Sequence, residues 1–138
     1  MPTRHRSPTA FDALRAVSGT GLVTFDGVDQ ATFAWSRVMR VTAQMGQQQY
    51  DMTRCLLIES DRERSIFLPE SEDLWAPFLT AMTKHLPDAI PFEAWGPRLL
   101  AEPRATITVY GHPDLPKKYS SYKEAFEWFL QRHPTRRR

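Results

Sequence analysis

The sequence feature that most constrains the fold is a short apolar run, Cys-Leu-Leu-Ile at residues 55–58, inside a β-favouring segment at residues 50–59. Successive side chains of a strand point to opposite faces of a sheet, so an unbroken apolar run needs cover on both faces. The run is far shorter than the roughly 20 residues that a membrane-spanning helix requires. It therefore predicts the central strand of a layered domain.

Shorter β-favouring segments lie on both sides of this strand. Asp26-Gly27 is a strong turn signal, and a polar connector at residues 46–49 and a charged turn at residues 61–64 separate further segments. The predicted strands cover residues 22–25, 31–35, 38–43, 50–59, 65–68 and 106–110. This order predicts an antiparallel meander, in which strands that are neighbours in sequence pair in space.

The clearest helix prediction covers residues 71–86. Ser71 can act as N-cap, and Glu72 and Asp73 place negative charge in the first turn, where the helix dipole favours it. Apolar residues then recur at three- and four-residue spacing, and this stripe is expected in the core. The stripe consists of Leu74, Trp75, Phe78, Leu79, Met82 and Leu86. Pro77 should kink the first turns unless the helix begins nearer Trp75.

Two other segments also favour helices. Ser7-Pro8 can start a short helix with Phe11 and Leu14 at helical spacing, ending at a glycine near residue 19 or 21. A last helix is predicted over residues 120–132, capped by Ser120 or Ser121.

Between the two longer helices, residues 87–104 contain prolines at positions 87, 91, 97 and 103. We expect this stretch to be irregular, because proline breaks regular hydrogen bonding. Phe92, Trp95 and Leu99 should nevertheless pack inward.

Together these patterns predict an α+β fold, a curled antiparallel sheet of five or six strands packed by two main helices. With 138 residues and no internal repeat or linker, the chain is expected to form a single domain over residues 1–138. The ends, at residues 1–6 and 134–138, are expected to be flexible.

The charge distribution argues against nucleic acid as a partner. The net charge is +2, but five arginines lie at the extreme ends, at positions 4, 6, 136, 137 and 138. Without them, residues 7–135 carry 13 basic and 16 acidic side chains, whereas a nucleic-acid-binding face needs basic residues clustered on the fold itself. The single cysteine, Cys55, and the lack of an apolar leader favour the cytoplasm. Because Cys55 sits within an apolar run, it is expected to be a buried, unreactive thiol.

The sequence contains no recognisable catalytic, metal-binding or cofactor-binding motif. Nucleophile elbows, phosphate-binding loops and dinucleotide fingerprints are absent, and the four histidines lack metal-ligand spacing. The carboxylate clusters fall where turns or helix starts are predicted, so we interpret them as solvated surface. We therefore expect no catalytic residues, no metal and no cofactor.

One pocket is predicted from the long strand. Asp51 and Arg54 lie three residues apart, so their side chains should point to opposite faces. Either one of them lies on an exposed face and the other at the strand end, or one of them lines a partner surface or a polar pocket. Such a pocket would lie between sheet and helices and include Trp35 and Tyr50.

A resemblance extends over residues 20–86. The order FAWSRVMRV, polar hairpin, YDMTRCLLIE, SIFLPE and then the acidic-started helix SEDLWAPFLTAM resembles small uncharacterised bacterial proteins of pleckstrin-homology-like appearance. The chain departs from that fold in having about five predicted strands before the helix. Some of these proteins sit beside secreted toxins, and the resemblance therefore implies an immunity role.

The expected function is that of a non-enzymatic protein-binding module, an immunity or adaptor protein that binds and occludes a toxin. The expected binding surface lies on the last helix, where Trp128 falls outside the apolar stripe and is either an exposed anchor or partly buried packing. Its neighbours in this surface are Tyr119, Tyr122, Glu124, Glu127 and Arg132. The alternative is a small-ligand-binding or catalytic domain with a pocket between sheet and helices.

Overall fold

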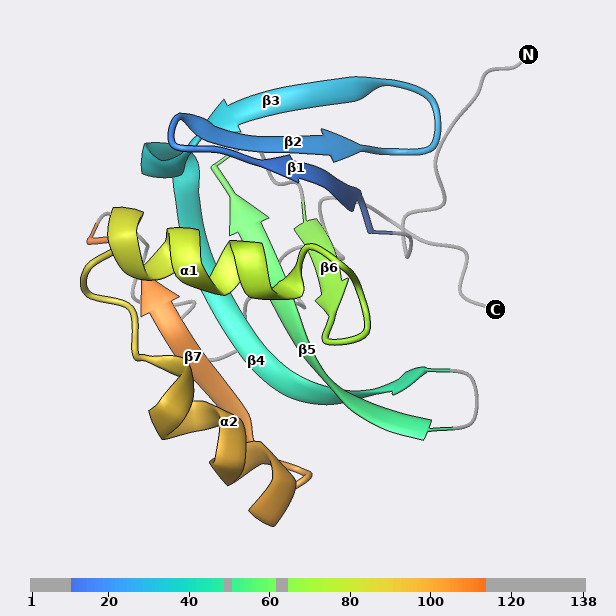
Figure 1. Ribbon diagram of the computed structural model, residues 1–138, viewed down its shortest axis with the longest axis vertical. Helices are drawn as coiled ribbons and strands as arrows, with labels where there is room; N and C mark the ends of the chain where they lie inside the picture. Colours follow the sequence, from blue (N-terminus) through green and yellow to red (C-terminus); the bar gives the residue numbers. More distant parts are fainter. Residues whose placement is uncertain (1–10, 49–50, 62–64, 114–138) are drawn as a thin grey trace.

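The computed structural model describes residues 11–48, 51–61 and 65–113, apart from the side chains of residues 47, 48 and 51. This part of the chain forms an α+β fold of seven strands and two helices (Figure 1). The strands form two antiparallel sheets, ordered β1-β2-β3 and β6-β5-β4-β7. The expected single curled sheet of five or six strands is therefore not confirmed.

The smaller sheet contains β1 (Ala13–Val17), β2 (Gly21–Phe25) and β3 (Gln30–Ala34). The predicted turn after β2 is present. Gly27 has a φ of 102°, and the Asp26 carboxylate accepts backbone N–H bonds from Val28 and Asp29, both at 2.8 Å. A positive φ carries no steric penalty for glycine, so the Asp-Gly pair sets this turn.

The helix predicted to begin at Ser7-Pro8 is wrong over its described part, because residues 13–17 form β1. The error has a physical cause. The pairing of β1 with β2 shifts register between Leu14 and Ala16, which marks a bulge. A bulge inserts one residue and interrupts the two-residue alternation. The alternation typical of a strand is therefore broken after Leu14. Phe11, which precedes the strand, stacks on Phe67 while Leu14 packs in the core, so these two residues imitate helical spacing.

The larger sheet contains β4 (Val38–Gln48), β5 (Asp51–Ser60), β6 (Ser65–Pro69) and β7 (Thr106–Gly111). All four were predicted, and β5 is a central strand between β4 and β6. Its residues 55–58 are almost completely buried, as the apolar run required. Val41 pairs with Ile58 and Ala43 with Leu56, so these four side chains share the face that contributes to the main core.

The two sheets meet where the chain enters β1. The backbone N–H of Asp12 donates to Ser65 O at 2.8 Å, and the N–H of Phe67 donates to Asp12 O at 3.2 Å. This isolated parallel bridge connects the small sheet to β6.

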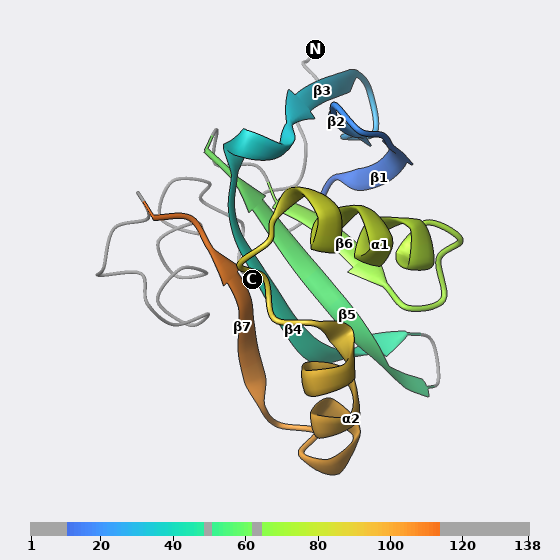
Figure 2. The same cartoon turned by 60° about the vertical axis from the view of Figure 1, so that its left-hand side comes forward.

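Helix α1 (Trp75–His85) crosses one face of the larger sheet below the smaller one (Figures 1 and 2). Its buried side includes Phe78 and Met82, as the stripe predicted. The predicted Ser71 cap is wrong, because the helix begins at Trp75 after a turn and has no side-chain cap. Pro77 consequently lies in the first turn, where its missing N–H removes no intrahelical bond.

Helix α2 (Phe92–Ala101) occupies the stretch expected to be irregular, so that prediction is wrong. Pro91 precedes the helix and Pro97 lies inside it. Tertiary packing compensates: Phe92 and Trp95 meet edge-on at 4.9 Å, and Trp75 of α1 contacts both rings edge-on. Such aromatic pairs each contribute about 0.5–1.5 kcal/mol beyond the buried area.

Neither α1 nor α2, the helices within the described ranges, is long and apolar enough to cross a membrane. The predicted helix at residues 120–132 and the expected flexible ends lie outside the described residues.

Candidate functional site

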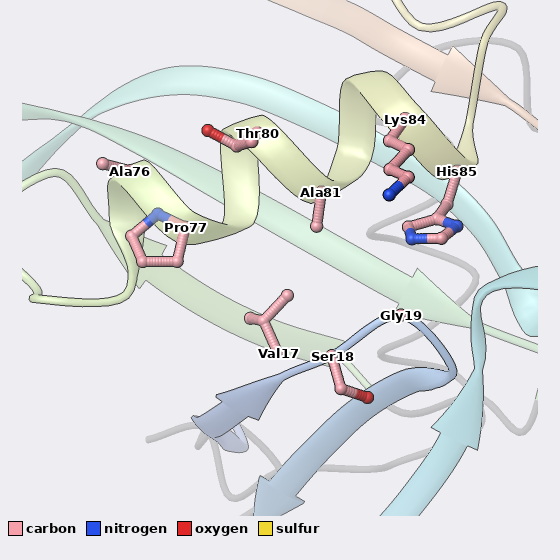
Figure 3. A pocket seen from close by; sticks show the side chains of 9 residues that line it. All are labelled: Val17, Ser18, Gly19, Ala76, Pro77, Thr80, Ala81, Lys84 and His85. Carbon is pink, nitrogen blue, oxygen red and sulfur yellow. The ribbon is translucent and has the colours of Figure 1, made fainter.

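An open groove lies between the β1–β2 turn and the outer side of α1, with a volume of about 510 Å³ (Figure 3). The turn contributes Val17, Ser18 and Gly19, and the helix contributes Ala76, Pro77, Thr80, Ala81, Lys84 and His85. The helical residues are pairs that recur every four positions, so they form a row along one side of α1. This row runs beside the buried stripe and is distinct from it.

Small side chains keep the groove open. Ala76 and Pro77 are exposed and Ala81 is half-buried, although none of them is polar. On the opposite wall, a Cβ added at Gly19 would lie 4.0 Å from His85 Nε2, which is ordinary van der Waals contact. Any larger side chain at position 19 would therefore extend into the groove.

Trp35 holds the two walls in place from beneath. It belongs to the short 3-10 helix η1 (Trp35–Arg37) that leads into β4, and only 5% of it is exposed. Its indole Nε1 donates to Ser18 O at 2.9 Å, which anchors the β1–β2 turn. Its ring stacks on His85 with centroids 5.3 Å apart, which anchors the end of α1. Trp35, a predicted pocket residue, thus supports this groove without lining it.

The β1–β2 turn is also fixed by its own hydrogen bonds. The Ser18 hydroxyl oxygen accepts the backbone N–H groups of Thr20 at 3.2 Å and Gly21 at 3.3 Å. A side chain that bonds to the backbone two or three residues ahead stabilises a turn locally. The wall of the groove is therefore preformed.

Positive charge is concentrated at one end of the groove. Lys84 is exposed and His85 is half-buried, and both lie in the last turn of α1, where the helix dipole favours the Lys84 ammonium group. The nine lining residues include these two basic side chains and no acidic one. The groove therefore combines an apolar floor with a positive end. Sequence reasoning missed it, because it assigned Pro77 only a helix-kinking role and did not pair the outer row of α1 with the turn.

A smaller hollow of about 290 Å³ lies where β1 meets β6, lined in part by Phe11, Asp12, Phe67 and Glu72. The Phe11 and Phe67 rings stack with centroids 5.8 Å apart. Because the Asp12 backbone connects the two sheets here, this hollow belongs to their junction.

Arg54, the second described residue of the predicted pocket, is engaged in an ion pair. Its Nε donates to Glu70 Oε1 at 2.8 Å and its Nη2 to Glu70 Oε2 at 2.7 Å. The guanidinium also lies over the Phe92 ring, 4.9 Å from its centroid. The hydrogen bond to Glu70, more than the opposing effect of burial, raises the pKa of Arg54. Arg54 thus joins β5 to the end of β6 and to α2.

We expect this bidentate pair to contribute about 1 kcal/mol to the free energy of unfolding, since its geometry is good but Glu70 is one-third exposed. A double-mutant cycle with Arg54→Met and Glu70→Gln, measured by urea unfolding, isolates this coupling. The exposed pair Arg98 and Glu102, 3.4 Å apart, serves as the control and should couple more weakly. Equal coupling in both cycles would contradict the assignment of Arg54 as a structural tie.

Trp35 and Arg54, the two predicted pocket residues whose side chains are described, lie apart in the structure. Trp35 precedes the end of β4 where Val38 pairs with Ser60, whereas Arg54 pairs with Met45 towards the other end of β5. Tyr50 and the side chain of Asp51 lie outside the described parts of the chain. The predicted surface around Trp128, with Tyr119, Tyr122, Glu124, Glu127 and Arg132, also lies outside them.

Cys55 is buried, as expected. Burial raises the pKa of its thiol to about 11. Its Sγ donates to Thr53 O at 3.4 Å. Since the thiolate is the nucleophilic form, these features describe an unreactive thiol.

A buried ion pair on the other face of the larger sheet was not identified from the sequence. Arg40 and Glu59 are paired in register on β4 and β5, with Arg40 Nε 3.8 Å from Glu59 Oε1. Arg40 is 1% exposed, and burial raises the pKa of Glu59 to about 7 against the lowering effect of Arg40. Alternation along β4 predicts that Arg40 shares a face with Thr42, but no local signal shows that this face is buried.

Within the described ranges, no three His, Cys, Asp or Glu side chains gather closely enough to hold a metal ion. Comparisons of the chain with protein-family models, curated proteins and solved structures found no match. The resemblance to toxin-immunity proteins therefore stays a prediction.

Proposed function

We propose that this protein is a binding module that holds an apolar segment of another protein in the groove between the β1–β2 turn and α1. The observation that carries the proposal is the row of small side chains on α1 that faces Val17 across an open space of about 510 Å³. Ligand sites in proteins commonly have volumes of about 300–1,000 Å³. A few apolar side chains of a partner would fill this space.

Two physical features support binding here. Each Å² of apolar surface that a partner removes from water contributes about 25 cal/mol. The walls are held by the Trp35–Ser18 hydrogen bond and the Trp35–His85 stack, so little ordering cost is added on binding.

The charges select the partner's chemistry. Lys84 and His85 lie at one end, and none of the nine lining residues is acidic. A segment with apolar side chains next to an aspartate or glutamate complements this arrangement. The narrower proposal, that the partner is a bacterial toxin, rests on the resemblance of residues 20–86 alone.

The experiment is a selection from a random peptide display library on the immobilised protein, followed by affinity measurement with the enriched peptides. We expect peptides in which apolar residues adjoin Asp or Glu. Thr80→Arg, which places a large side chain inside the groove, should weaken binding at least tenfold, because that side chain takes the space of the partner's apolar residues. Thr83→Arg is the matched control, since Thr83 is exposed on the same helix and does not line the groove.

Equal binding by the two arginine variants would remove the groove from the interface. Failure to enrich any peptide, together with shifts of groove resonances by small carboxylates in NMR titrations, would favour the alternative of a small-ligand site between sheet and helix.

A further inference from the structure

The two sheets have four edge strands, and backbone hydrogen bonds to other described segments reach β6, β7 and the residue that precedes β1. Asp12, directly before β1, joins β6 through bonds of 2.8 and 3.2 Å, and β1 itself contains a bulge and the charged Arg15. The N–H of Ile90 donates to Val109 O on β7 at 2.8 Å. Among described residues, the edge of β3 that faces away from β2 has no such bond.

The β3 edge also lacks the features that normally prevent edge pairing. Its sequence, Gln-Ala-Thr-Phe-Ala, contains no charge and no proline, and every residue except Phe33 is exposed. Its register with β2 runs without a bulge from Gln30 to Ala34. Natural edge strands are usually protected by charged residues, proline, bulges or covering segments. Figure 1 shows β3 at the outer rim of the molecule.

We propose that β3 pairs antiparallel with β3 of a second copy of this chain, centred on Thr32. The three-stranded sheet then becomes a continuous six-stranded sheet across a twofold axis. Thr32 lies opposite itself, a pair that can form a hydrogen bond between hydroxyls, and Gln30 lies opposite the partner subunit's Ala34. No like charges meet along the strand.

The charges beyond the ends of β3 complement this register. In an antiparallel pair centred on Thr32, the β2–β3 turn with Asp26 and Asp29 approaches the partner subunit's Arg37. The Arg37 side chain is 42% exposed and reaches Asp61 only at 3.5 Å, so it is accessible to a second carboxylate. Opposite charges at both ends favour a second copy in this orientation over an arbitrary extended peptide.

Strand pairing over five residues buries less than the roughly 1,200 Å² typical of stable complexes. We therefore expect a reversible dimer that is populated only at high protein concentration. The groove is lined by the β1–β2 turn and α1, and no residue of β3 lines it. The dimer is therefore independent of the proposed peptide binding.

Sedimentation velocity across about a hundredfold range of concentration should show a shift from monomer towards dimer. Thr32→Lys places two like charges directly opposite each other and should abolish the shift, while the Thr80→Arg variant should retain it. The far-ultraviolet circular dichroism of Thr32→Lys should match the wild type, because the side chain is exposed.

Disulfide crosslinking tests the register. Thr32→Cys should form a covalent dimer under mild oxidation, because directly opposite Cβ atoms lie about 4.5–5.5 Å apart. Gln30→Cys is the control, since its two copies are separated by several residues along the strand and cannot be bridged. Monomer at every concentration, or equal crosslinking of the two variants, would overturn the proposal. Protection of β3 amides by an unrelated protein, with the isolated chain monomeric, would instead assign the edge to a different partner.

Discussion

Replacing Phe78 with alanine is expected to lower the free energy of unfolding by about 3–5 kcal/mol, the usual cost of removing a large aromatic side chain from a core. Phe78 is fully buried on the inner side of α1. Its ring contacts Trp35 with centroids 5.7 Å apart. The hydrogen bond to Ser18 and the stack on His85 hold Trp35 in place, so Trp35 is not expected to fill the cavity. The loss should therefore be near the upper end of this range.

Urea unfolding followed by tryptophan fluorescence measures this loss. Thr83→Ala, on the exposed side of the same helix, should stay within about 0.5 kcal/mol of the wild type. An unfolding midpoint for Phe78→Ala close to that of the wild type would show that the stripe on α1 does not form the core.

The second large effect is a pH dependence that arises from Glu59. Burial raises the pKa of Glu59 to about 7 in the folded chain from 4.5, its ordinary value. The folded state therefore binds more protons than the unfolded state between these two values. Stability contributed by this group falls as the pH rises through the window. The penalty for the buried carboxylate is absent below about pH 4.5 and fully developed above about pH 7.

The size of the effect follows from the shift, since each pKa unit corresponds to 1.36 kcal/mol. Because of Glu59, the free energy of unfolding should be about 3 kcal/mol lower above about pH 7 than below about pH 4.5. Glu59→Gln removes the titrating group, so the difference in stability between wild type and variant should change by this amount across the window. The measurement is urea unfolding at a series of pH values.

Glu59→Asp is the matched control, because it keeps a buried carboxyl group on the same strand and should keep the pH dependence. If Glu59→Gln and the wild type had parallel stability curves, Glu59 would be ionised at neutral pH in spite of its burial. The ion pair with Arg40 would then be stronger than its 3.8 Å separation indicates.

The sequence by itself determined the elements whose signals are local. Asp26-Gly27 forms a hairpin turn wherever two strands flank it, because its backbone preference does not depend on distant residues. The apolar run at residues 55–58 had to lie in a central strand with cover on both faces. The stripe that includes Phe78 and Met82 predicted α1. The helix begins at Trp75, four residues later than predicted, because Ser71 to Asp73 belong to a preceding turn.

Tertiary structure decided the features that depend on distant partners. The bulge in β1 is visible only in its pairing with β2, and Phe11 and Leu14 imitated helical spacing because they pack against different parts of the fold. Pro97 predicted that residues 87–104 are irregular, because proline removes a helical hydrogen bond. The contacts of Trp95 with Trp75 and Phe92 outweigh this cost, and α2 forms.

The same reason applies to the candidate sites. The groove exists because Trp35 contacts both Ser18 of the turn and His85 of the helix, which are more than 50 residues apart in sequence. The pKa of Glu59 is raised because the fold buries its carboxyl group. Arg54 forms an ion pair because the end of β6 places Glu70 beside it. Local patterns report backbone preference and periodicity, whereas burial and opposition of side chains arise only when separate segments meet.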